Sequence, residues 1–141
     1  MNIDLNAMSQ VATISSSIIA LIAVFFIIFQ IKSSNKDNKM VTAHTTYNGY
    51  LKLCFDNPYY AKGINEKSDN VDVRYEQYKW FVSSMLFSFE EILAVYPNDK
   101  RWFFALESQL ERHRNFLKNS SSVKRGEWSK PLTSLLEKIT R

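Results

Sequence analysis

The sequence is poor in the residue types that build most metal, nucleotide and disulfide sites. It holds one cysteine, two histidines and three glycines among 141 residues. The lone Cys54 excludes an intrachain disulfide, and it fits either a reducing compartment or a small buried side chain. His44 and His113 lie too far apart for the helical motif of zinc hydrolases, and the scattered glycines form no phosphate-binding loop. We therefore expect no metal and no cofactor.

Charge of either sign is missing from the N-terminal part of the chain. No ionisable side chain lies between Asp4 and Lys32, and all 18 lysines and arginines lie at or beyond Lys32. The apolar run over residues 11–31 would extend about 30 Å as a helix, which matches the hydrocarbon core of a bilayer. A soluble core helix would show a polar face, and a cleaved signal peptide would carry basic residues before the run. The pattern predicts a transmembrane helix over 11–31 after an N-terminal tail, 1–10.

Basic residues follow the apolar run but do not precede it. Lys32, Lys36 and Lys39 come directly after it. Because basic residues beside a span favour the cytosolic side, we expect the N-terminus outside and the rest of the chain in the cytosol, at the inner (cytoplasmic) membrane. The polar stretch 32–39 lacks proline and glycine, so it is either a joint or a stalk that continues the membrane helix.

Small residues gather on one face of the predicted span. They are Ala12, Ser16, Ala20 and Ala23. In lipid, small side chains let a second helix approach closely, so this ladder predicts self-association within the membrane. The alternative is that the spacing arose by chance, because small residues are common in membrane helices.

Beyond the span, apolar residues recur at helical intervals over residues 40–141. A coiled-coil-like seam is formed by Met40, His44, Tyr47, Leu51 and Cys54, and it predicts a helix that packs on a partner and stops before Pro58. A second helix is expected over residues 71–95, after a loop over 63–70. Asn98 or Asp99 is expected to cap a third helix, and a last one should begin near Pro131.

No segment alternates in the manner of a strand. The predicted fold class is therefore all-α, with one N-terminal transmembrane helix followed by a small antiparallel helical bundle over residues 40–141. Within that bundle the expected inward faces are regular. They comprise Tyr75, Tyr78, Val82, Met85, Phe89, Ile92 and Tyr96, then Trp102, Leu106, Leu110, His113 and Leu117, then Leu132, Leu135, Leu136 and Ile139.

Signals of catalysis are weak. Glu90 and Glu91 are adjacent, so on a helix they point about 100° apart and do not form an acid and base pair. An arginine near a histidine is typical of helical ribonucleases, but Arg101 lies too far before His113 to complete such a centre. His113 also shares the apolar face of its helix, which favours a core histidine. We expect a protein that is not an enzyme.

Cations near Trp128 suggest an anion-binding surface. They are Arg112, Arg114, Lys118, Lys124, Arg125 and Lys130. Arginine binds phosphate well, and an aromatic ring can stack on a base, so a nucleotide or RNA is one expected ligand. The alternative is a solvated face, or one that contacts anionic lipid head groups.

Two sequence stretches carry a resemblance at the level of layout. Phe55 to Ala61 reads FDNPYYA, and an aromatic helix runs from Tyr78-Lys79-Trp80-Phe81 to Phe89-Glu90-Glu91-Ile92. With the uncharged anchor, this plan resembles small bacterial membrane proteins with a helical cytosolic domain. It is also similar to the membrane accessory proteins of type VI CRISPR systems, which implies a membrane-associated assembly linked to antiviral defence.

Three hypotheses of function fit these features. The first is a homo-oligomeric, non-enzymatic membrane protein that forms a pore or perturbs the membrane as an antiviral defence effector, with the lipid bilayer and further copies as partners. The second is a tether that presents its helical bundle to a cytosolic protein. The third is a membrane-bound sensor of a nucleotide or RNA.

Overall fold

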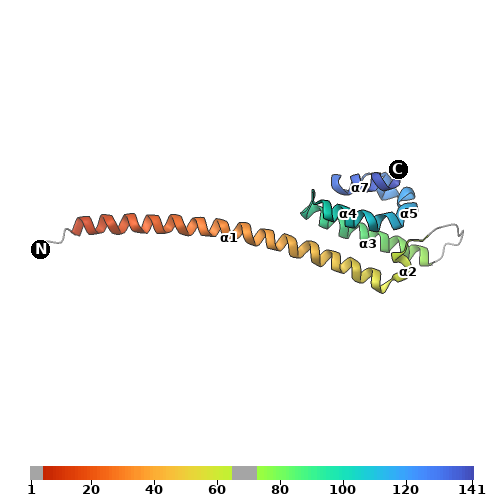
Figure 1. The fold of residues 1–141 in the computed structure, drawn as a ribbon, viewed down its shortest axis with the longest axis horizontal. Coiled ribbons are helices and arrows are strands. Elements are labelled where there is room, and N and C mark those ends of the chain that lie inside the picture. Colours follow the sequence, from red (N-terminus) through yellow and green to blue (C-terminus); the bar gives the residue numbers. More distant parts are fainter. Residues whose placement is uncertain (1–4, 65–72) are drawn as a thin grey trace. The chain divides into compact units, whose positions relative to one another are not determined.

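The regular structure is entirely helical in the part of the chain that the computed structural model describes, residues 5–64 and 73–141, with side chains described from residue 15 onward apart from Ser17. The elements are α1 (Leu5–Asp56), α2 (Pro58–Ala61), α3 (Val73–Val95), α4 (Lys100–Leu110), the 3₁₀ turn η1 (Glu111–His113), α5 (Arg114–Asn119), α6 (Ser121–Lys124) and α7 (Lys130–Thr140) (Figure 1). The predicted all-α class is confirmed. Two compact units divide the chain, residues 1–39 and 40–141.

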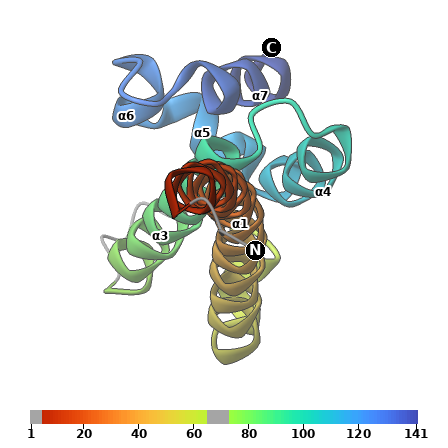
Figure 2. The ribbon, with the colours of Figure 1, turned by 90° about the vertical axis from the view of Figure 1, so that its left-hand side faces the viewer.

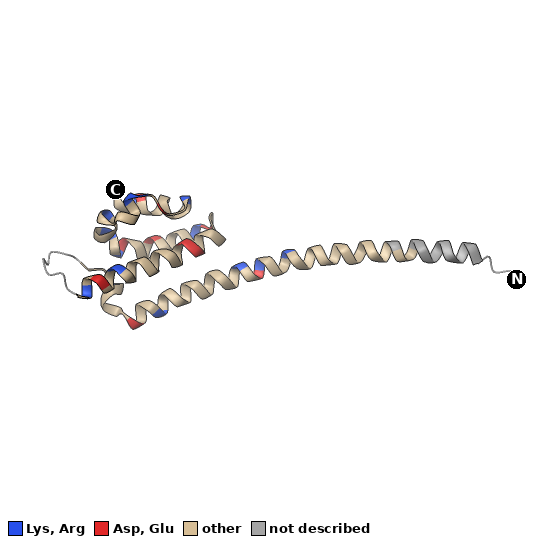
Figure 3. Cartoon of the chain, turned by 180° about the vertical axis from the view of Figure 1, so that it is seen from behind, with Lys and Arg blue, Asp and Glu red and all other residues tan. Residues whose placement is uncertain are grey.

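The first unit consists largely of the apolar part of α1. The helix begins at Leu5, so part of the predicted tail is helical, and it continues without a break through residues 32–39. The backbone of that polar stretch is therefore helical. From Ile18 onward α1 is the one helix of the described residues long and apolar enough to span a membrane, with a mean hydropathy of 1.9. In the described residues of this unit, charge begins only at Lys32 (Figure 3).

The end of α1 follows the local sequence. The helix stops at Asp56, as predicted from Pro58, and the Asn57 side chain donates a hydrogen bond of 3.0 Å to the carbonyl of Leu53. After the short α2, Gly63 adopts φ +78°, and a Cβ there would lie 2.0 Å from the carbonyl oxygen of Arg112. Only glycine meets both demands, which lets the two backbones pass closely.

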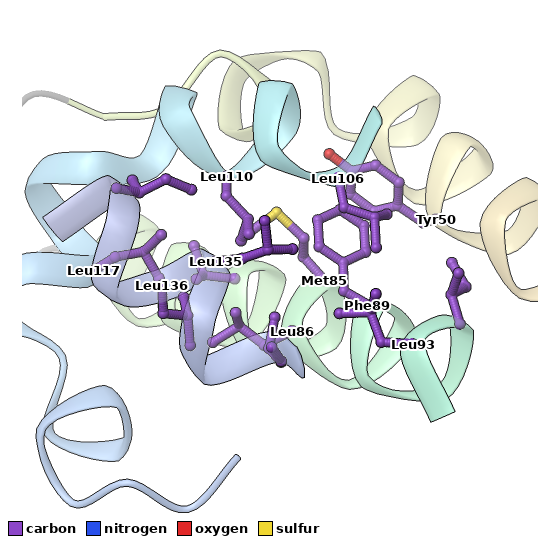
Figure 4. Packing of buried hydrophobic residues seen from close by; sticks show 14 of the residues in the cluster. Tyr50, Met85, Leu86, Phe89, Leu93, Leu106, Leu110, Leu117, Leu135 and Leu136 are labelled. Carbon is purple, nitrogen blue, oxygen red and sulfur yellow. The ribbon is translucent and has the colours of Figure 1, made fainter. Parts of the chain in front are cut away.

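The core of the second unit is built around α3. Eight of its residues are buried, and they occupy one side of the helix. Figure 4 shows Phe89 of α3 beside Leu106 of α4 and Tyr50 of α1. The Phe89 and Tyr50 rings meet edge to face with centroids 4.9 Å apart. Apolar burial of this extent is the main stabilising contribution to the domain.

Asp99 starts α4 and fulfils the cap prediction. Its carboxylate accepts hydrogen bonds from the amides of Arg101 (2.8 Å) and Trp102 (3.3 Å), which would otherwise lack partners at the helix start. These bonds, led by that from Arg101, hold the pKa of Asp99 below its usual value. Of the two predicted caps, the structure uses Asp99 and not Asn98.

The C-terminal helix α7 closes the core. Its four inward residues are those predicted, Leu132, Leu135, Leu136 and Ile139, and it packs on α3, α4 and α5. Pro131 lies in the first turn, where a missing amide hydrogen costs nothing. The carboxylate of Glu90 accepts two hydrogen bonds from Ser129, one from its amide (3.0 Å) and one from its hydroxyl (2.9 Å). This contact joins the start of α7 to α3.

Candidate functional site

The small-residue ladder lies on the apolar part of α1. Ser16, Ala20 and Ala23 are exposed in the single chain, and Ala12 lies outside the residues whose side chains are described. Ile22 and Phe25 of the bulky face are exposed too, at 52% and 72%. No side of this segment is covered by the chain itself from Ile18 onward, so self-association through the ladder stays a prediction.

The face of α1 that packs in the domain coincides in part with the predicted seam. Tyr47 and Cys54 pack against the core and the His44 ring lies 5.6 Å from the Trp102 ring, whereas Met40 and Leu51 are exposed. The buried positions are instead Ala43 (0% exposed) and Tyr50 (1% exposed). The face of α1 that packs within the domain is therefore displaced by roughly 50° about the helix axis from the predicted seam, and packing of Met40 and Leu51 on a partner stays a prediction.

His113 is a core residue. Its side chain is 1% exposed, and Nδ1 shares a hydrogen bond of 2.8 Å with the Tyr78 hydroxyl. Burial, with a smaller effect of the nearby Arg112 charge, lowers the pKa of His113 to about 4, so the ring is neutral at pH 7. Nε2 is also buried and has no hydrogen-bond partner in the described residues. A ring enclosed in this way packs the core, as the sequence favoured.

The six predicted cations differ in their surroundings. Arg114 pairs with Glu111 at 3.2 Å, and Arg125 pairs with Glu127 at 2.5 Å. Lys118, Lys124 and Arg125 line a pocket of about 570 Å³ together with Trp128, which also holds Glu137. Arg112, Arg114 and Lys130 do not line it. Three of the six thus share a pocket lining with Trp128, and anion binding by the group stays a prediction.

A second and larger pocket was not predicted. It has a volume of about 680 Å³ and lies where α3 meets the segment from α5 to α6. We call it the serine pocket, after its hydroxyl groups. Its serine hydroxyls and its ammonium groups come from Ser83, Ser120, Ser121, Ser122, Lys79 and Lys118.

A row of exposed apolar side chains on α3 was also not predicted. It follows the outer side of α3 at intervals of seven residues, and we call it the α3 stripe: Val73, Trp80, Phe87 and Ala94. Trp80 is 72% exposed and Phe87 is 66% exposed, which is unusual for aromatic side chains. The seven-residue spacing of Val73, Trp80 and Phe87 is visible in the sequence, but only the burial of the opposite side of α3 identifies it as an outer face.

An apolar groove lies between α4 and α7, two helices that lie next to each other in Figure 2. We call it the α4–α7 groove. Its volume is about 510 Å³, and its apolar lining comprises Pro97, Phe103, Phe104 and Leu135. At its rim Lys138 and Glu107 form an ion pair, whereas Lys100 has no ion-pair partner in the described part of the chain.

No protein-family model, curated protein or solved structure matches this chain. Its function must therefore be inferred from the geometry of its own residues.

Proposed function

We propose that this protein is a single-pass membrane protein whose helical domains associate head to tail with further copies of the same chain. The anchor half of the proposal is supported by residues 18–31, where every large apolar side chain is at least 50% exposed. Lipid is the surrounding that such a surface fits. The lysines after the span support a cytosolic domain at the inner membrane, with the N-terminus outside.

The α3 stripe carries the assembly half of the proposal. Trp80 projects from a helix whose opposite side packs in the core, and Phe87 remains 66% exposed although its ring meets the Trp128 ring edge to face, with centroids 5.3 Å apart. Exposed aromatic side chains of this size are the usual anchors of protein interfaces, because each buries a large apolar area. The stripe itself is uncharged, and Glu91 beside it is exposed and accepts a hydrogen bond of 2.9 Å from Thr46.

The α4–α7 groove is the complementary surface. Phe103, Phe104 and Leu135 give it an apolar lining that suits an inserted aromatic side chain. The charges also match. The ion pair Lys138–Glu107 cancels and leaves Lys100 positive, and in the proposed contact Lys100 meets the negative Glu91 beside the stripe. Complementary charges fix orientation and exclude wrong partners more than they add affinity.

When two different surfaces of one protein bind each other from copy to copy, the copies form rings or filaments rather than closed pairs. Anchors that all enter one bilayer favour a ring, and the ring gathers the anchors beneath it. Ser16, Ala20 and Ala23 would then meet neighbouring anchors, where small side chains allow close packing. Gathered anchors are the means by which the assembly would perturb the membrane.

The test is the particle mass of the full chain in detergent or lipid nanodiscs. Trp80→Ser and Phe87→Ser should reduce the assembly to monomers, because each removes an apolar anchor from the stripe. Phe55→Ser is the matched control, since Phe55 is 84% exposed but lies on α1, away from the stripe. A wild-type particle that is monomeric would overturn the proposal and favour the tether.

A charge exchange tests the pairing of the two surfaces. Glu91→Lys and Lys100→Glu should each weaken assembly, and the double variant should restore it, since the opposite charges meet again across the contact. If the double variant assembles no better than the single ones, the stripe does not dock in the groove. Leakage of dye from vesicles, compared between wild type and Trp80→Ser, then measures membrane perturbation.

Orientation has its own measurement. A reporter fused after Arg141 should be active in the cytosol, and replacing Lys32, Lys36 and Lys39 with glutamine while adding lysines before residue 5 should invert it. A phage challenge of cells that carry wild type or Trp80→Ser tests the defence role that the resemblance implies.

A further inference from the structure

We propose that the serine pocket binds a small phosphate ester with an aromatic base, of the size and chemistry of a mononucleotide. The inference is independent of assembly, since it concerns a different surface of the domain. Its volume of about 680 Å³ falls in the range of small-molecule sites, about 300–1,000 Å³.

The polar residues that line the serine pocket favour an anionic ligand. None of the described lining residues is acidic, whereas two are lysines. Lys118 is exposed and has no ion-pair partner among the described residues, so its charge is available to a ligand. Lys79 pairs with Glu76 at 2.7 Å, and its ammonium also lies 4.9 Å from the centroid of the Tyr75 ring.

Hydroxyl and amide groups surround the lysines. Ser120 and Ser122 lie 3.1 Å apart at their hydroxyl oxygens, and each keeps further capacity to donate or accept. Ser83, Ser121 and Asn119 add further polar groups to the same lining. Several hydroxyls and two lysines in one lining match the many acceptor oxygens of a phosphate group.

Apolar groups provide the rest of the recognition. Val82 and Leu86 belong to the buried core and form the floor. Tyr75 and Phe116 form a wall, with their rings edge to face and centroids 6.3 Å apart. A flat base can pack on such a wall while its phosphate reaches Lys118, which is why a nucleotide fits better than a bare anion.

The experiment measures binding of ADP, adenosine and inorganic pyrophosphate to the full chain in nanodiscs, by calorimetry at low and at physiological salt. ADP should bind most tightly, since it alone has both parts. Lys118→Gln should weaken ADP binding about tenfold or more, the effect of losing a charge-assisted hydrogen bond. Lys124→Gln is the matched control, because Lys124 is exposed, lines only the neighbouring pocket, and removes the same charge. It should change ADP binding by less than about twofold.

A neutral variant separates the pocket from general charge. Ser83→Trp fills the space without altering net charge and should abolish ADP binding, while circular dichroism and the melting temperature show whether the domain is still folded. Should Ser83→Trp unfold the domain, the comparison of Lys118→Gln with Lys124→Gln decides alone. Equal weakening by both lysine variants, no binding of ADP by wild type, or pyrophosphate that binds as tightly as ADP would each overturn the proposal.

Discussion

The two units of this chain use apolar residues in opposite ways. From Ile18 to Ile31 every large apolar side chain is at least 50% exposed, whereas the domain encloses a core in which Val82, Met85 and Phe89 are 0% exposed. The domain therefore provides its own apolar surroundings, whereas residues 18–31, the proposed anchor, find none among the described residues. As a result, the stability of the domain should be sensitive to the shape of its buried side chains. The membrane insertion of the proposed anchor should be sensitive to the polarity of its side chains.

The largest expected effect tests shape within the domain. Phe89→Ala should destabilise the domain by about 3–5 kcal/mol, because it removes a fully buried ring and leaves a cavity. Phe25→Ala, the same change in the anchor, should leave the unfolding of the domain unaltered. Chemical denaturation in a mild detergent measures both. An equal loss of unfolding free energy in the two variants would contradict the difference that we expect between the two units.

The second effect tests polarity within the anchor. Ile22→Arg should disfavour membrane insertion by about 2.5–3.5 kcal/mol, since a charge near the centre of a span is costly. Ile22→Leu is the control and should insert as the wild type does. The fraction of protein that stays in the membrane pellet after alkaline extraction reports the difference. A wild type that alkali extracts from the membrane as fully as the arginine variant would mean that this segment does not span the bilayer.

The third effect is a pH dependence that belongs to the domain alone. His113 has a pKa of about 4 when folded and an ordinary value of 6.5 when unfolded, so the unfolded state binds more protons between these limits. The contribution of the neutral His113 to the free energy of unfolding is fully present above pH 6.5. It is lost as the pH falls toward 4. The loss between pH 7 and pH 5 should be about 2 kcal/mol.

The measurement is denaturation at several pH values. His113→Phe should flatten the dependence between pH 7 and 5, whereas replacement of the exposed His44 by glutamine should keep it. If both variants keep the wild-type slope, carboxylates rather than His113 set the acid sensitivity.

The smallest effect concerns the helix cap of α4. Asp99→Ala should lower the melting temperature of the domain by roughly 2–6 °C, because two amides lose their acceptor. Asn98→Ala, next to it, should have little effect, since the hydrogen bonds go to Asp99. A larger fall for Asn98→Ala would show that the cap is assigned to the wrong residue.

Much of the fold could be predicted because the signals are local. Pro58 ends α1, Asp99 caps α4, and the apolar face of α7 has the predicted members. Each depends on backbone chemistry or spacing within a few residues. Local rules of this kind hold wherever packing does not oppose them.

The packed face of α1 was less predictable. Met40, Leu51 and Phe55 are as apolar as the residues that turn inward, so periodicity alone allows more than one stripe. The choice is made by shape. Ala43 is small enough for a neighbouring helix to pass closely, and Tyr50 places its ring on Phe89 while its hydroxyl lies 3.3 Å from the Gln109 side-chain oxygen.

The pockets could not be predicted, because their residues come together only in the folded domain. The serine pocket joins Ile64, residues of α3 and the segment 115–122. No spacing rule relates such distant positions. The cations near Trp128 were partly found, because Lys124, Arg125 and Trp128 are close in sequence.

The aromatic cluster around His113 has a consequence for motion. The Tyr78 ring packs on His113 and Phe116, with centroids 5.7 Å and 5.2 Å away, and Phe81 lies 5.8 Å from His113. A half-turn of the Tyr78 ring keeps its hydroxyl in place, but its edges must pass these neighbours. In a close-packed interior that rotation waits for a brief expansion of the surrounding rings. The two edges of Tyr78 should therefore give separate nuclear magnetic resonance signals at low temperature, and these signals should merge on warming. The rate of ring rotation then measures how often the core of the domain expands.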